Sequence, residues 1–280
     1  MRDELGNRLK RNYENVSKTY LTRRMPVIIR LDGKAFHSFT KGFNKPFDDV
    51  FVDTMRDTAE YLCKNIQGCV FGYVQSDEIS LLLVDYKNLN TDAWFNYGVQ
   101  KCVSVAASMA TMAFNKFFSE NTENFCKKHI KHDQFNCEYL EKEDEKRYSN
   151  YLKSIEKGAV FDARIFNIPK EEVVNYFIWR QNDCYRNCIN SISQCLFSQN
   201  EIFGKNTLEL KELIGDKYDY EDWKLFGVSI LKGNGGSTPT SVCVDDIRGM
   251  LNTQPIWNYC CFNFKENRNI IERTFIFNEG

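Results

Sequence analysis

Hydrophobic and polar positions follow two patterns along the chain, one typical of strands and one typical of helices. Short apolar runs bounded by polar residues or glycine occur at 26–31, 70–74, 79–84 and 160–166, and each predicts a strand. The second and third runs are separated only by Gln75-Ser76-Asp77-Glu78. This spacing predicts a hairpin over about 69–85 with its tip at those four residues.

Apolar residues at helical spacing predict the intervening helices. One helix is expected from about Asp48 to Lys64 and a second from Trp94 to Phe118, where alanines offer a face for close packing. A third begins near Lys170, with acids in its first turn that suit the helix dipole, and continues to about Asn187. Residues 2–21 also predict a helix, with an apolar stripe of Leu5, Leu9, Tyr13, Val16 and Tyr20.

The order of these elements predicts the fold class. After the N-terminal helix it reads β-α-β-β-α-β, the ferredoxin-like order, so we expect an α+β palm with an antiparallel sheet, added helices and a C-terminal extension. The strongly charged residues at about 119–157 suggest a surface insertion. We expect a palm-type domain over 1–168. We expect residues 169–280 to form a helical and β part that packs on it and serves RNA contacts and oligomerisation, with a glycine-rich loop and turn-separated strands near its end.

Two acidic motifs carry the candidate chemistry. Asp32 ends the first predicted strand and Asp77 lies at the hairpin tip, so the two converge at one end of the sheet if the hairpin pairs beside that strand. Paired carboxylates bind hard divalent cations, and Mg²⁺ bridges such groups to substrate phosphates. The alternative is that Asp32-Gly33 is only a turn and Asp77 only a solvated acid, since both residue types dominate turns.

Composition limits the classes of partner and compartment. The 280 residues are 42% hydrophobic and carry a formal net charge of −1, which excludes a uniformly basic nucleic-acid binder but not a locally basic groove. The 11 cysteines include no C-x-x-C pair, which favours free thiols in a reducing compartment. The N-terminus is polar and acidic and no run has the length of a membrane helix. We therefore expect a cytoplasmic protein, without excluding a mitochondrial role.

Five motifs, in order, resemble the tRNAHis guanylyltransferase family, whose members add nucleotides to RNA 5′ ends in the 3′–5′ direction. The similar segments are Arg30-Leu31-Asp32-Gly33-Lys34-Ala35-Phe36-His37-Ser38-Phe39, Lys45-Pro46, Tyr73-Val74-Gln75-Ser76-Asp77-Glu78-Ile79-Ser80, Phe161-Asp162-Ala163-Arg164 and Trp179-Arg180-Gln181-Asn182-Asp183-Cys184. The resemblance runs from about residue 5 to 230, and 233–280 has no counterpart that we can place.

One departure from the family pattern bears on substrate choice. Where guanylyltransferases proper carry His-Ile-Asn-Asn-Leu-Tyr-Asn, this chain has Tyr185-Arg186-Asn187-Cys188-Ile189-Asn190-Ser191. The family motif is associated with recognition of tRNAHis, and the guanylyltransferase-like branch that lacks it repairs 5′-truncated tRNA against a template. The resemblance therefore implies templated 5′-end repair, with addition of one fixed guanosine to tRNAHis as the alternative.

The resemblance also implies the cofactors and the site residues. Two Mg²⁺ ions would be held by Asp32, Asp77 and the carbonyl of Gly33, with Glu78 as a further catalytic acid. ATP and GTP or other nucleoside triphosphates would be substrates beside tRNA with an incomplete 5′ end, and the protein would form a homotetramer. The nucleotide-binding candidates are Gly33, Lys34, Ala35, Phe36, His37, Lys45, Ser76 and Lys101. The RNA-binding candidates are Arg30, Arg164, Arg180 and Asn187.

Several of these assignments have plain structural alternatives. Glu78 has the alternative of a surface carboxylate, Lys101 that of a solvated helix residue and His37 that of a packed core histidine. Arg164 and Asn187 have the alternative of satisfying backbone groups. Two rival functions remain: an RNA-binding relative without catalysis, and a palm-type nucleotide cyclase that needs no RNA.

Overall fold

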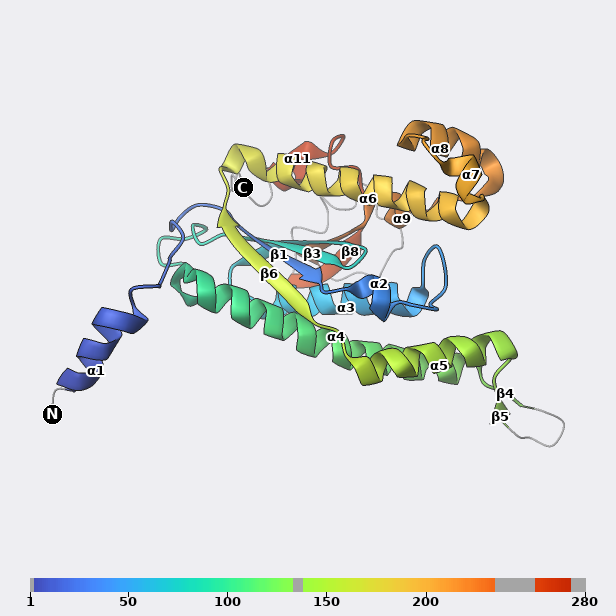
Figure 1. Cartoon of the computed structure of the whole chain (residues 1–280). Coiled ribbons are helices and arrows are strands. Elements are labelled where there is room, and N and C mark those ends of the chain that lie inside the picture. Colours follow the sequence, from blue (N-terminus) through green and yellow to red (C-terminus); the bar gives the residue numbers. More distant parts are fainter. Residues whose placement is uncertain (1–2, 133–137, 235–254, 273–280) are drawn as a thin grey trace.

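A single antiparallel sheet organises the chain in the computed structural model, which describes residues 3–132, 138–234 and 255–272 (Figure 1). Its strands are β1 (Val27–Gly33), β2 (Cys69–Gln75), β3 (Glu78–Leu83), β6 (Phe161–Asn167), β7 (Val228–Asn234) and β8 (Pro255–Cys260). Their order is β6-β1-β3-β2-β7-β8, and every neighbouring pair is antiparallel.

Helices cover both faces of this sheet. One face packs against α3 (Asp49–Asn65) and α4 (Val99–His129), and the other against α6 (Val173–Leu196). The order β1-α3-β2-β3-α4-β6 is the predicted β-α-β-β-α-β arrangement, so the α+β fold class is confirmed. The second half of the chain adds β7 and β8 to the same sheet, beyond β2.

The remaining helices are short or lie at the periphery. They are α1 (Glu4–Leu9), α2 (Phe36–Phe39), α5 (Lys142–Lys157), α7 (Gln199–Ile202), α8 (Thr207–Ile214), α9 (Asp222–Phe226) and α11 (Arg268–Ile271), with a small hairpin of β4 (Lys131–His132) and β5 (Glu138–Tyr139). Among the helices of the described ranges, none is long and apolar enough to cross a membrane.

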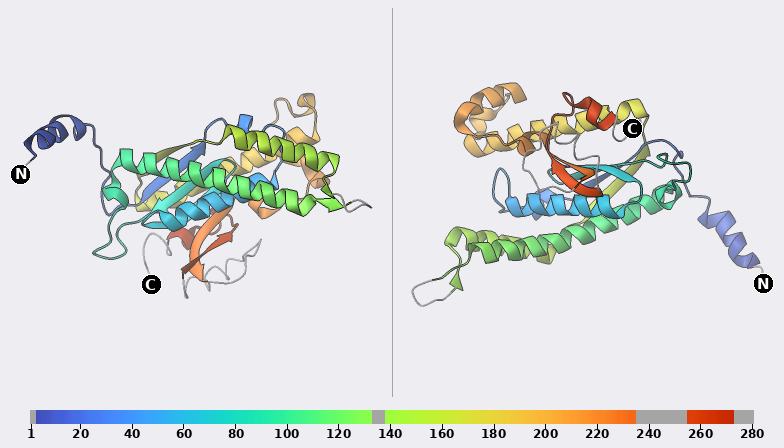
Figure 2. Two further views of the ribbon diagram at one scale, coloured as in Figure 1. Left: turned by 90° about the horizontal axis from the view of Figure 1, so that it is seen from below. Right: turned by 180° about the vertical axis from the view of Figure 1, so that it is seen from behind.

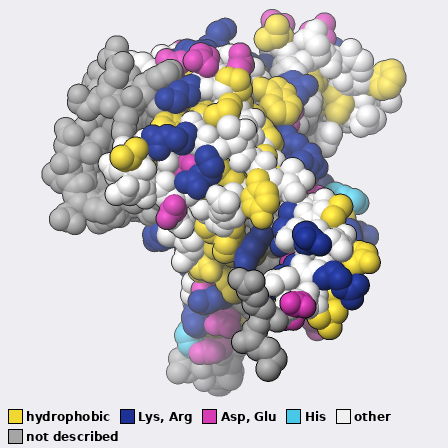
Figure 3. All heavy atoms as spheres, turned by 90° about the vertical axis from the view of Figure 1, so that its left-hand side faces the viewer, with side chains coloured by type: hydrophobic (Ala, Val, Ile, Leu, Met, Phe, Trp, Pro, Cys, Tyr) yellow, Lys and Arg dark blue, Asp and Glu magenta, His cyan; other side chains and the backbone are white. Residues whose placement is uncertain are grey.

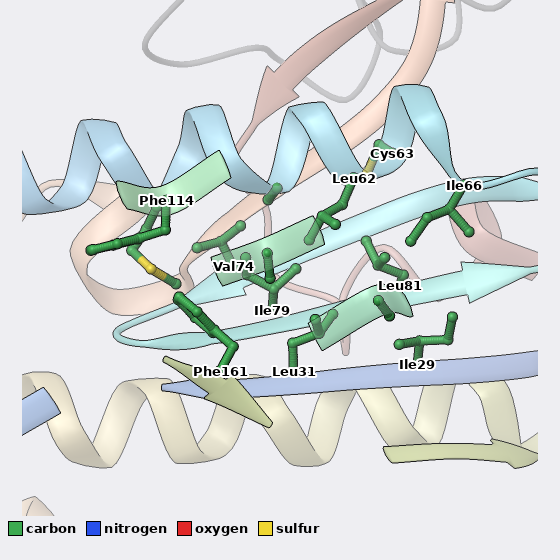
Figure 4. Close-up of a cluster of buried hydrophobic side chains, with 14 of the residues drawn as sticks. Ile29, Leu31, Leu62, Cys63, Ile66, Val74, Ile79, Leu81, Phe114 and Phe161 are labelled. Carbon is green, nitrogen blue, oxygen red and sulfur yellow. The ribbon is translucent and has the colours of Figure 1, made fainter. Parts of the chain in front are cut away.

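The face toward α3 and α4 holds the larger core (Figure 4). Alternate residues of the strands, including Ile29, Leu31, Ile79 and Leu81, are fully buried there, as the two-residue period of a strand requires. At the end of β1 the core becomes aromatic, with ring centroids 5.1–6.1 Å apart in the cluster Phe36, Phe39, Phe51, Phe114, Phe118 and Phe161.

The opposite face is held by α6 and by a C-terminal segment. Ile28, Phe71 and Leu82 pack there with Phe177 of α6. The Gln181 amide of α6 donates to the carbonyl of Phe262 (2.9 Å) and accepts from the N–H of Phe264 (2.8 Å). This side chain therefore fastens the segment after β8 to α6.

The charged region 119–157 is more integrated than the expected surface insertion. Helix α4 extends to His129 and so ends well beyond the predicted end at Phe118. Helix α5 then folds back along α4 (Figure 1). Tyr151 of α5 is fully buried, and its hydroxyl donates to the Asp48 carboxylate at 2.7 Å. The expected surface insertion thus also contributes to the core, because the charges of α5 occupy the outer face of an amphipathic helix.

The structure of the N-terminal arm differs from the single helix predicted over 2–21. It contains α1 and a π-helical turn, Lys10–Glu14, and it projects from the body (Figure 2). The five residues of its predicted apolar stripe are between 45% and 73% exposed. Figure 3, which views the end from which the arm projects, shows Lys and Arg side chains separated by apolar and neutral groups rather than one continuous basic surface.

Candidate functional site

The acidic motifs meet at the end of the central strands. Asp32 in β1 lies opposite Glu78 of β3 on one side and opposite Asp162 of β6 on the other. The N–H of the next residue, Gly33, donates to the carbonyl oxygen of Asp77 at 3.1 Å. The structure therefore brings the Asp32 and Asp77 segments together, as the hairpin argument predicts.

Burial and neighbouring carboxylates change the pKa of Asp77. Burial raises the pKa of the Asp77 carboxyl above its ordinary value, and the neighbouring Asp32 and Glu78 carboxylates raise it further. The Ser76 hydroxyl, which donates to Asp77 at 3.1 Å, acts in the opposite direction. A bound cation would relieve this repulsion, because it favours the charged form of the carboxylates.

The donor set at this edge fits Mg²⁺ completed by other ligands. Within the described ranges no group of three or more His, Cys, Asp and Glu side chains is arranged to hold a metal ion, so a closed protein cage is excluded there. Two carboxylates and the Gly33 carbonyl supply hard oxygen donors only. Mg²⁺ is commonly bound through one or two carboxylates, with water and substrate phosphates completing its octahedron.

Glu78, the predicted third acid, is held by an arginine. The Arg180 guanidinium donates to both Glu78 oxygens at 2.7 Å and to Asp183 at 2.8 Å. Arg180 is 7% exposed, so it does not present its charge to an RNA backbone as predicted. The structure places it instead as the residue that orients Glu78, through a bidentate pair of high geometric specificity.

A cavity of about 230 Å³ opens beside the hairpin tip. Lys45, Ser76 and Asn187, three candidates from separate motifs, line it together. Its walls also include aromatic rings, and Phe47 meets Trp223 edge to face at 5.4 Å. Apolar walls with a few polar groups are typical of small-molecule sites, and this volume suits part of a nucleotide, such as a base.

The cavity also contains residues to which the sequence assigned no role. Gln75 is 4% exposed, and its side-chain oxygen has no hydrogen-bond partner among the described residues. Trp223, Lys224 and Gly227 enter from the segment before β7. Gln75 was visible within a motif, but its unpaired amide was not, and nothing in the local sequence links Trp223 to residues 40–56.

The loop after β1 places its residues unequally. Lys34, Ala35 and His37 are exposed beside Asp32, so the packed-core alternative for His37 does not apply. The Phe36 ring, by contrast, is 4% exposed within the aromatic core and lies under Gly33, where a Cβ would come within 2.3 Å of it. Only the backbone of Phe36 is therefore available to a nucleotide, and Gly33 is required by this close approach.

Lys101 is not brought to the site. It lies in the first turn of α4, with its ammonium 4.8 Å from the Phe95 ring centroid. The part of α4 nearest to Gly33 is around Thr111, whose hydroxyl accepts from the N–H of Phe161, the residue opposite Gly33. Ten helical residues separate the two positions, about 15 Å along the axis. The nucleotide-binding assignment of Lys101 is therefore not supported within one chain.

Arg30 and Arg164 lie opposite each other on β1 and β6, on the α6 face of the sheet. The Arg164 side chain is 54% exposed and lies 3.8 Å from the Asp162 carboxylate. Arg30 is partly buried and lies under the Trp179 ring. Both arginines are thus close to Asp32 and on the same face of the sheet.

Comparison with known proteins relates this arrangement to one family. The model of the tRNAHis guanylyltransferase family matches residues 7–169. An uncharacterised protein of Acanthamoeba polyphaga mimivirus is 29% identical over 82% of this chain and 77% of its own length. The tRNA(His) guanylyltransferase of Debaryomyces hansenii is 30% identical over 58% of this chain, which spans about half of that relative.

Solved structures give the same relationship. A bacterial tRNA(His) guanylyltransferase-like protein in complex with ATP matches 98% of this chain and 99% of its own, with 31% identity and a TM-score of 0.73. A bacterial tRNA(His) guanylyltransferase-like protein in complex with GTP matches 98% of this chain and all of its own, with 32% identity and a TM-score of 0.73. The enzyme from Saccharomyces cerevisiae, at 19% identity and a TM-score of 0.58, shares the fold. With its motifs, its fold and its family match in agreement, the chain belongs to the tRNAHis guanylyltransferase family of nucleotidyltransferases.

Proposed function

We propose that this protein adds nucleotides to the 5′ end of tRNA in the 3′–5′ direction and repairs 5′-truncated tRNA against its own template strand. The observation that carries the proposal is the meeting of Asp32 and Asp77 beside a cavity lined by Lys45 and Ser76. The similarity to proteins solved with ATP and with GTP supports nucleoside triphosphates as substrates.

The residues of the site divide the work of the reaction. Asp32, Asp77 and the carbonyl of Gly33 would hold two Mg²⁺ ions, which when bound neutralise charge developing on the phosphates. Lys45 and Ser76 contact triphosphate oxygens, and the exposed Lys34, Ala35 and His37 border the same end of β1.

The chemistry has three steps in this account. The 5′-monophosphate of the RNA attacks the α-phosphate of ATP, which forms an adenylylated 5′ end and releases pyrophosphate. The 3′-hydroxyl of an incoming nucleoside triphosphate then attacks the activated 5′-phosphate, forms the new phosphodiester bond and releases AMP. Pyrophosphate is finally removed from the newly added nucleotide. The protein positions the two reactants, and such positioning supplies a large share of the barrier reduction in phosphoryl transfer.

Two observations support templated repair over addition of a fixed guanosine. The segment Tyr185–Ser191 lacks the tRNAHis-associated motif, and its Asn187, Cys188 and Ser191 line the cavity. The guanylyltransferase-like bacterial protein also matches more closely than the Saccharomyces cerevisiae enzyme. When base pairing selects the nucleotide, the protein needs only to hold the backbone and orient the 3′-hydroxyl.

The test uses full-length protein, Mg²⁺, all four nucleoside triphosphates and tRNAs truncated opposite each of the four template bases. We expect the added base to complement the template in every case. Guanosine addition regardless of template, and only to tRNAHis, would instead establish the alternative activity. No addition to any RNA, with RNA binding intact, would leave a non-catalytic RNA-binding protein.

The proposal includes a homotetramer, as the family resemblance implies. The exposed apolar stripe on the N-terminal arm is a surface that such an assembly would cover. Sedimentation of the full chain tests this part, and a monomer at micromolar concentration would refute it.

A further inference from the structure

Trp179 presents an exposed indole beside the acidic edge. Trp179 lies on α6, one residue before Arg180, and it is 52% exposed. The Arg180 guanidinium lies 4.5 Å from the ring centroid, Arg30 lies 5.8 Å from it, and the Tyr176 ring is 5.9 Å away. The ring is therefore fixed in orientation by its neighbours while half of its surface remains open.

Three arginines lie around this ring, and they are paired with carboxylates to different extents. Arg180 is matched by Glu78 and Asp183, and Arg164 is matched weakly by Asp162 at 3.8 Å. Across the ranges that the structure describes, Arg30 has the Trp179 ring as its partner and no carboxylate within ion-pair distance. An anionic partner is thus favoured at this place over a neutral or apolar one.

The surface around Trp179 and the cavity lie on different sides of the candidate metal-binding carboxylates. Arg30 and Asp32 lie two residues apart on one face of β1, about 7 Å at the rise of a strand. The cavity takes residues of β2 and β7, such as Gln75 and Val228, on the other side of β1 and β3 in the sheet order. The carboxylates therefore lie between two surfaces, as a reaction joining two substrates requires.

We propose that Trp179 is a stacking platform for a base at the 5′ end of the RNA substrate, with Arg30 and Arg164 contacting the adjacent phosphates. The inference rests on the proposed function for the identity of the substrate as RNA. Aromatic rings stack on bases of any sequence, and arginines beside them neutralise the backbone. A second copy of this chain fits less well, because an apolar partner surface would bury the Arg30 charge without a counter-ion.

The experiment uses a 5′-truncated tRNA with 2-aminopurine as its 5′-terminal base and compares Trp179→Leu, Trp179→Phe and the wild type. We expect the wild type to quench the 2-aminopurine fluorescence on binding. Trp179→Leu should abolish the quenching and weaken RNA binding by about 5- to 150-fold, with KM for ATP unchanged. Trp179→Phe, which keeps a ring, should remain within a few-fold of the wild type. Phe203→Leu is the matched control, since Phe203, the residue directly after α7, is 81% exposed.

The phosphate contacts have a separate readout that does not depend on the ring. Arg30→Gln should reduce the slope of log K against log salt by about 1. It leaves the indole in place, so it reports on the surface even if Trp179→Leu fails to fold. An unchanged salt slope would remove Arg30 from the RNA contact.

Three results would overturn the platform. They are absence of quenching by the wild type, unchanged RNA affinity in a folded Trp179→Leu protein, and a change in sedimentation without a change in RNA affinity, which would mark a protein interface. A wild type that quenches through Trp179 but adds no nucleotide would sustain the platform and refute the proposed function, so the two failures are distinguishable.

Discussion

The two faces of the central sheet differ most where β1 ends. Toward α3 and α4 the surface stays apolar to the last residue, closed by rings such as Phe36 and Phe114. Toward α6 the same strands begin apolar at Ile28 and become ionic at Arg30 and Asp32. Because side chains alternate along a strand, one segment supplies both surfaces. Neighbouring residues of β1 thus supply the apolar core on one face and the candidate site on the other.

The largest effect should come from the acids on the ionic face. Asp32→Asn and Asp77→Asn should each lower the rate of nucleotide addition by about a thousandfold or more, because each removes a metal-ligating charge. Their melting temperatures should be no lower than that of the wild type, since neither group supports the apolar core. Single-turnover addition to 5′-truncated tRNA measures the loss, with the exposed Asp216→Asn as control. Activity above a tenth of wild type in either variant would contradict the assignment.

The apolar face should show the opposite behaviour. Phe114 is fully buried among several rings, so Phe114→Ala should lower the free energy of unfolding by about 3–5 kcal/mol. The protein that remains folded should add nucleotides at close to the wild-type rate. Urea unfolding measures the free energy of unfolding. The addition rate per active site, with the sites counted by titration, measures the activity of the folded protein. Met112→Ala, half exposed on the same helix, is the control. A stable but inactive Phe114→Ala protein would erase the distinction between the faces.

Arg180 connects the ionic face to α6. Arg180→Leu leaves the partly buried Glu78 without its bidentate partner, which should cost about 3 kcal/mol of stability and slow addition. Arg180→Lys should recover part of the stability but less of the rate, because a lysine cannot hold both oxygens in one geometry. Parallel measurement of unfolding and of kcat against KM separates the roles. Equal rescue of both quantities by lysine would show that only the charge matters.

A smaller and step-specific effect is expected in the cavity. Lys45→Ala should slow activation of a 5′-monophosphorylated RNA about tenfold, while addition to a 5′-triphosphorylated RNA changes little. The reason is that only the first reaction places ATP phosphates beside this cation. Lys41→Ala, exposed on the same loop and outside the cavity lining, is the control. Equal losses on both RNAs would remove the step-specific role.

The strand ends and the pairing of Asp32 with the hairpin tip followed from the sequence, because period-two alternation and a short polar tip fix register locally. The connection itself is shorter than predicted, since Gln75 and Glu78 are paired residues of β2 and β3. The partner of Glu78 did not, since Arg180 lies 102 residues away. Periodicity placed Lys101 on a helix but could not give its position along the sheet. The high charge of α5 likewise concealed the buried Tyr151. Contacts made across the fold, rather than local propensity, account for these differences.

The central claim is that Asp32 and Asp77 bind the divalent ions that the reaction needs. Its most direct test is Mn²⁺ binding to the full chain with ATP, counted by electron paramagnetic resonance for the wild type, Asp32→Asn and Asp77→Asn. The account predicts two Mn²⁺ ions per chain in the wild type and at least one fewer in each variant. Wild-type stoichiometry and affinity in both variants would contradict it.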